Sequence, residues 1–170
     1  TEGAARALVE LVGEDTVRLD GELRKVALAH RGTDAVGERE IVAMVGRTAE
    51  AKPWEFVDAF AARDARRCLS LLGRMESTSV HALMAMCATR LRELVCARSM
   101  IDRGNARGIA AALKAPEWRV KNHAAWARGF SAAELRAALV SARDAERAMK
   151  SGADADAVFL EWALRVMAKR

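Results

Sequence analysis

The sequence predicts an all-α protein on three observations. The 170-residue chain has two prolines, eleven glycines and no tyrosine, and its many Ala, Leu, Arg and Glu residues favour helices. No segment shows the strict two-residue alternation of a half-buried strand. Apolar residues recur instead at helical spacing, between start and stop signals. With 52% apolar and 30% charged residues, the chain has the balance of a folded globular protein, long enough for one good core or two small ones.

Residues 1–50 are expected to form a small subdomain of three short helices. The first is EGAARALVELVG. The second, DTVRLDGELRKVALAHRG, is expected to stop at Gly32, and the third runs from about Glu38 to Val45. The segment Thr48–Pro53 is the expected boundary, because Pro53 suits a first helical turn and keeps the residue before it out of α geometry.

Residues 53–170 are expected to form a larger helical domain. It begins with the helix pair PWEFVDAFAAR and DARRCLSLLGRM, and a long helix follows from about Ser79 to Arg103. RGNARG breaks the pattern, IAAALKA is a short helix, and Pro116 opens a helix that continues to about Arg128.

The next helix has the clearest start and stop signals in the chain. Ser131 and Glu134 form a capping box, and Gly152 suits the left-handed residue that ends a helix. Asp144 with Arg147, and Glu146 with Lys150, are spaced to pair along its polar side.

The last helix, DADAVFLEWALRVMAK, is apolar on nearly every side. Only Glu161 and Arg165 form a narrow polar stripe, so the helix is central to a bundle core or shared with another subunit. We take Phe159, Trp162 and Val166 as candidate residues of a subunit interface.

Charge is distributed unevenly along the chain. Residues 1–52 carry 8 Lys and Arg against 10 Asp and Glu, whereas residues 53–170 carry 20 against 13. A basic helical surface is either a solvated one or one that meets a polyanion. The most apolar long stretch, Val80–Met100, contains four charged residues and is not a membrane span. Thr1 is followed by acidic residues rather than by the basic-then-apolar order of a signal peptide. The abrupt start without Met suggests a fragment of a longer protein.

No residue pattern predicts catalysis or a metal. Cys68, Cys87 and Cys96 lack C-x-x-C spacing, and the three histidines are scattered, so the cysteines are interpreted as small buried thiols in a reducing cytoplasm. We expect no catalytic residue, because general acid–base and nucleophilic chemistry both need converging groups.

Three stretches of the chain follow one another in an informative order. They are DTVRLDGELRKVAL, an acidic start followed by E-x-x-K; PWEFVDAFAARDARRCLSLLGRM, a helix pair; and IAAALKAPEWRVKNHAAWARGFSAAELRAALVSARDAERAMKSG. The third runs from a short helix through proline, basic helix, F-S cap and L-x-x-A-L to D-x-x-x-x-x-K-x-G. From about Thr16 to Met167 the chain thus resembles the delta subunit of the bacterial DNA polymerase III clamp loader. The segment ERAM, Glu146–Met149, is more charged than is usual in that family.

The resemblance implies a three-domain subunit, of which this chain holds the last two parts. Residues 1–50 would be the lid-like end of an AAA+ module, and residues 53–170 the collar domain that joins a ring of five clamp-loader subunits. The implied partners are the other loader subunits and, through the assembled complex, primed DNA. The sliding clamp would be reached only through an N-terminal domain absent from this sequence. The implied role is non-catalytic, without cofactor or metal, in the bacterial cytoplasm.

A helix-turn-helix DNA-binding regulator is the alternative function. IAAALKAPEWRVKNHAAW could place its second helix in a major groove, although Pro116 and Trp118 stand where base-reading side chains are expected.

Trp118, Arg119 and Lys121 are the candidate DNA-binding residues. If Val120 faces the core, Trp118 points away from it, and an exposed aromatic among basic residues can stack on an unpaired base. The competing interpretation is that Trp118 covers the IAAAL helix as a hydrophobic staple.

Overall fold

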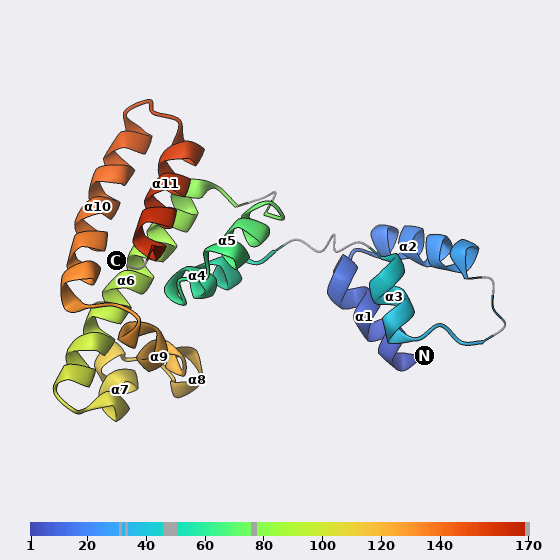
Figure 1. Ribbon diagram of the computed structural model, residues 1–170, viewed down its shortest axis with the longest axis horizontal. Helices are drawn as coiled ribbons and strands as arrows, with labels where there is room; N and C mark the ends of the chain where they lie inside the picture. The colour runs from blue at the N-terminus through green and yellow to red at the C-terminus, as the bar shows by residue number, and fades with distance from the viewer. Residues whose placement is uncertain (31, 33, 46–50, 76–77, 169–170) are drawn as a thin grey trace. The chain divides into compact units, whose positions relative to one another are not determined.

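The computed structural model describes residues 1–30, 32, 34–45, 51–75 and 78–168, and all the regular elements in these ranges are helices (Figure 1). The predicted all-α class is therefore confirmed. The chain divides into two compact units, Thr1–Ala51 and Lys52–Arg170. Most of the boundary predicted over Thr48–Pro53 lies outside the described residues.

The first unit contains α1 (Glu2–Val12), α2 (Thr16–Ala29) and α3 (Glu38–Met44). Helices α1 and α3 pack closely, and α2 adds one buried side chain. The core of this unit consists of Ala4, Ala7, Leu8, Val12, Val26, Ile41 and Val45.

Helix α2 begins as expected and ends early. The Asp15 carboxylate accepts hydrogen bonds from the Val17 and Arg18 amides at 2.9 and 3.2 Å. The helix ends at Ala29 rather than at the predicted Gly32. His30 is the C-cap residue, and its Nε2 lies 2.9 Å from the Asp34 carbonyl oxygen.

The second unit opens with α4 (Pro53–Ala61), α5 (Ala65–Leu72) and the long helix α6 (Val80–Asp102). Pro53 occupies the first turn of α4, as the sequence predicts. Arg63, in the turn between α4 and α5, has a φ of 58°, a left-handed conformation that a residue with a side chain rarely adopts.

A run of short helices follows at the C-terminal end of α6: η1 (Ala106–Gly108), α7 (Ile109–Leu113), α8 (Glu117–Val120) and α9 (His123–Arg128). The prediction of a single helix from Pro116 to about Arg128 is therefore wrong. It is interrupted after Val120, and Asn122, a weak helix former, lies at the break with φ −95° and ψ −10°. Helix α9 packs on α6.

The unit closes with α10 (Ala132–Lys150) and α11 (Ala155–Met167), which pack on each other and on α6 (Figure 1). The predicted capping box is present: the Glu134 amide donates to Ser131 Oγ at 3.1 Å, and the Ser131 amide donates to Glu134 Oε2 at 2.7 Å. Gly152 has the expected left-handed φ of 92°. Lys150 pairs with Glu146 as predicted, but Asp144 pairs with Arg143 instead of Arg147.

Aromatic and leucine side chains from α4, α6, α10, α11 and the segment between α9 and α10 fill the core of the second unit. The largest of them are Phe56, Phe60, Leu83, Leu91, Leu94, Phe130, Leu135 and Phe159. Among the described residues, no helix is long and apolar enough to cross a membrane.

Candidate functional site

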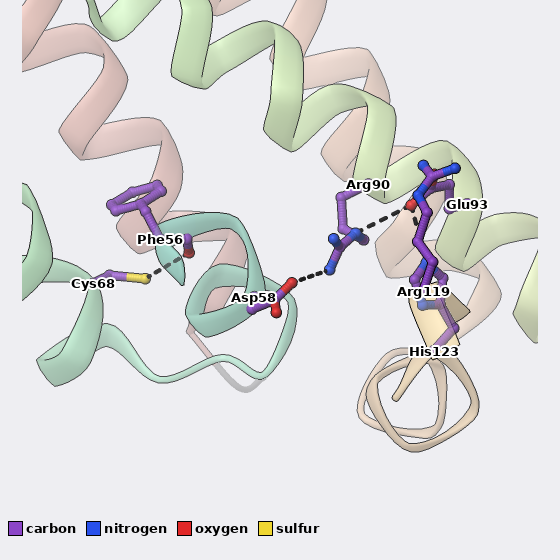
Figure 2. Close-up of polar contacts among 7 residues, drawn as sticks. All are labelled: Phe56, Asp58, Cys68, Arg90, Glu93, Arg119 and His123. Carbon is purple, nitrogen blue, oxygen red and sulfur yellow. Dashed lines mark hydrogen bonds and ion pairs between the residues drawn. The ribbon is translucent and has the colours of Figure 1, made fainter. Parts of the chain in front are cut away.

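A cluster of charged side chains ties four helices of the second unit together (Figure 2). We call it the Glu93 cluster; its members are Asp58 from α4, Arg90 and Glu93 from α6, Arg119 from α8 and His123 from α9. Glu93 Oε2 accepts from Arg90 Nε at 3.1 Å and lies 2.9 Å from His123 Nε2. Glu93 Oε1 accepts from Arg119, and Arg90 also donates to Asp58 Oδ1 at 2.7 Å.

The centre of the cluster is shielded from water, whereas Asp58 and Arg119 at its edges are partly exposed. The Glu93 and Arg90 side chains are 12% exposed, and His123 is fully buried beside the ring of Trp126, over which the Arg90 guanidinium lies at 4.8 Å. Both oxygens of Glu93 already accept hydrogen bonds, so the carboxylate is poorly placed to take a substrate proton. The arrangement suits a structural joint that fixes α8 and α9 against α6.

The predicted DNA-binding residues lie next to this joint, on α8 and just beyond it. Trp118 is 74% exposed and Lys121 is exposed, whereas Arg119 is held by Glu93. A side chain so exposed cannot cover the α7 helix as a staple does, so the competing interpretation of Trp118 does not fit. Helix α8 has four residues, too few for the recognition helix of a helix-turn-helix protein.

The predicted interface residues on α11 lie mostly in the core. Phe159 is fully buried and Trp162 is 3% exposed; the Trp162 ring stacks on Phe60 at 5.4 Å, and its Nε1 donates to Ser141 at 3.1 Å. These two side chains offer no surface to another subunit in this structure, because the bundle itself buries the apolar face of α11. Val166 is half-buried and borders a cavity between α10 and α11.

The comparison with protein families gives a match in the second unit. The model for the DNA polymerase III delta subunit, C-terminal domain, matches residues 50–166, which is most of the second unit. The chain belongs to this family.

A solved structure agrees with the family at the level of the fold. The DNA clamp loader delta protein of Bacillus subtilis matches with a TM-score of 0.61 at 21% identity, over 99% of this chain and 51% of that protein. The chain therefore spans about half the length of this relative. No curated protein matches the sequence.

The delta-family bundle buries two of its cysteines in unreactive positions. Burial raises the pKa of the Cys68 thiol to about 12, with the Asp64 carboxylate adding to the effect, and burial also raises the pKa of Cys87. Cys68 Sγ lies 3.7 Å from the Phe56 carbonyl oxygen, to which it can donate (Figure 2). All three cysteines are free, and no group of three potential metal ligands comes together among the described residues.

Reasoning from the sequence missed both the Glu93 cluster and the role of Arg63. The available signal was a charged pair, Arg90 and Glu93, inside the most apolar stretch of the chain. Arg63 gave no such signal. Its guanidinium lies 3.9 Å from the centre of the Phe130 ring and donates to Glu134 Oε1 at 2.7 Å.

Proposed function

We propose that the chain is the C-terminal part of a clamp-loader delta subunit, which helps to assemble the loader that places the sliding clamp on primed DNA. The observation that carries the proposal is the delta-family match across most of the second unit. Residues 1–50 are proposed to be the lid-like end of an AAA+ module, and residues 53–170 the collar that joins the ring. We expect the protein to work in the bacterial cytoplasm, where the chromosome is replicated.

We infer that the role is non-catalytic. The sequence has no G-x-x-x-x-G-K-[ST] loop, whose amides, lysine and hydroxyl hold phosphate and Mg²⁺ in P-loop ATPases. The charged residues that do come together, in the Glu93 cluster, are occupied with one another.

Assembly with other subunits is tested by native mass spectrometry. The chain is mixed with the remaining purified clamp-loader subunits of the same organism. The proposal expects a complex containing one copy of the chain. A chain that stays at its own mass, while the other subunits form their complex without it, would refute the proposal.

We further propose that the α8 region contacts primed DNA, with the Trp118 ring stacking on an unpaired base and Lys121 meeting a phosphate. The exposure of both side chains supports the proposal. Arg119 receives a different role from the one expected of it, because its bond to Glu93 makes it an anchor for α8.

Two variants of the assembled loader separate stacking from charge. Trp118→Ala should weaken binding to a primed template by ~1–3 kcal/mol while leaving the salt dependence nearly unchanged. Lys121→Ala should flatten the dependence of log K on log salt by about one phosphate contact. The DNA contact is wrong if both variants bind primed DNA and load clamps as the parent does.

A further inference from the structure

A second basic feature of the bundle lies in a cavity between α6 and α10. The cavity has a volume of about 370 Å³ and is bordered by the last turns of α6 and the first turn of α10. Its polar lining is Arg98, Ser99, Asp102, Arg103 and Arg136, and its apolar lining is Val95, Ala132 and Leu135.

Three arginines and one carboxylate line this cavity. Arg98 Nη2 and Nε donate to Asp102 at 2.7 and 3.2 Å, and Arg98 Nη1 donates to the Phe130 carbonyl oxygen at 3.4 Å. Asp102 is therefore already neutralised. The Arg103 and Arg136 side chains are exposed and make no hydrogen bond or ion pair with any residue that the structure describes. The cavity thus retains two uncompensated positive charges.

The surroundings of the cavity favour an anion. Ala132 is the first residue of α10, a helix of 19 residues, so the positive end of the helix dipole lies at the cavity, although the Glu134 carboxylate and the Ser131 hydroxyl already accept from two of the amides there. The Ser99 hydroxyl, at the wall of the cavity, can donate a further hydrogen bond. A fixed guanidinium, two free ones and a hydroxyl match the several oxygen acceptors of a phosphate group.

We propose that this cavity binds a backbone phosphate of DNA, at a site separate from Trp118. The inference rests on the proposed function, because it takes DNA as the polyanion. The balance of 20 Lys and Arg against 13 Asp and Glu over residues 53–170 favours a polyanion over an isolated acidic side chain. Arg98 acts as the pre-positioned donor, and Arg103 and Arg136 close on the phosphate.

The test measures the salt dependence of DNA binding by the full chain. Fluorescence anisotropy follows a labelled primed template from about 50 to about 200 mM salt. The variant is Arg103→Ala with Arg136→Ala. The control, Arg143→Ala with Arg147→Ala, removes the same charge from exposed positions in the second half of α10. Thermal melting verifies that both variants are folded.

The proposal expects the slope of log K against log salt to flatten by about one in the cavity variant, because the cavity holds one phosphate, with affinity at low salt falling about tenfold. The control should keep most of the slope. Arg103→Lys with Arg136→Lys should keep it too, because point charges also release counterions. No DNA binding by the parent chain, an unchanged slope, or equal losses in variant and control would each overturn the proposal.

Two further measurements identify other occupants. If inorganic phosphate shifts the Arg Nε–H NMR signals of the parent while the DNA slope is unaffected by the variant, the site holds free phosphate, and the DNA proposal is overturned. If the variant keeps its DNA slope and loses its place in the assembled loader, the occupant is a partner's carboxylate, which also overturns it. Native mass spectrometry of the variant, which should assemble normally, separates failure of this inference from failure of the proposed function.

Discussion

The position of Trp162 bears on whether the apolar face of α11 serves folding or assembly. Its ring stacks on Phe60, and its N–H donates to Ser141, so one side chain joins α4, α10 and α11. Buried aromatic residues contribute to folding through area and through the cavity that their removal leaves.

Trp162→Ala should lower the free energy of unfolding by ~3–5 kcal/mol, measured by chemical denaturation. Trp162→Phe should cost less, because the ring contact remains while the hydrogen bond to Ser141 is lost. Trp118→Ala is the matched control and should change stability little, since Trp118 is 74% exposed. A stable Trp162→Ala chain that fails only in assembly would contradict this role and support a position of Trp162 in a subunit interface.

Glu93 holds three basic side chains with one carboxylate, so its removal should cost more than the loss of a surface ion pair. Glu93→Ala leaves the Arg90 guanidinium, 12% exposed, without one of its partners, and should destabilise the chain by ~3–5 kcal/mol. Glu161→Ala breaks the exposed pair with Arg165 and should cost at most ~1 kcal/mol. Equal melting temperatures for the two variants would contradict the role given to Glu93.

Helix α10 shows which structural features of a helix can be predicted from the local sequence. Its capping box and its left-handed glycine were predictable, because each depends on residues within a few positions of the helix end. The break between α8 and α9 was not. The break coincides with a contact between His123 and Glu93, which are 30 residues apart. The periodicity of the sequence carries no information about such a contact.

The start of α10 should respond to pH. The Ser131 amide and then the Arg63 guanidinium lower the pKa of Glu134 from 4.5 to about 2. Because the folded-state pKa is the lower one, the ionised Glu134 stabilises the fold above about pH 4.5, and this contribution is lost as pH falls from 4.5 toward 2.

Glu134→Gln should therefore lower the free energy of unfolding by ~1 kcal/mol at neutral pH, and the difference from the parent should shrink steadily below about pH 4.5. Urea unfolding between pH 3 and pH 7 measures it. Glu161→Gln, on the exposed side of α11, should show no such trend. A difference that is the same at every pH would show that Glu134 acts only through packing.

Composition and spacing were enough to predict the all-α class, and the order of three stretches pointed to the delta family. The function of α11 was harder to predict, because a helix with apolar residues on most sides looks the same whether its own bundle or a partner covers it. Phe159 and Trp162 are covered by helices far away in the sequence. Only the three-dimensional structure shows whether the chain's own bundle or a partner covers this helix.

We propose that the second unit is the module through which this chain joins a clamp loader. Hydrogen–deuterium exchange of the full chain, alone and mixed with the other loader subunits, tests it most directly. We expect new protection on assembly within Lys52–Ala168, at surface segments rather than at the already buried core of α11. Exchange that is unchanged throughout these residues, or protection confined to residues 1–51, would contradict it.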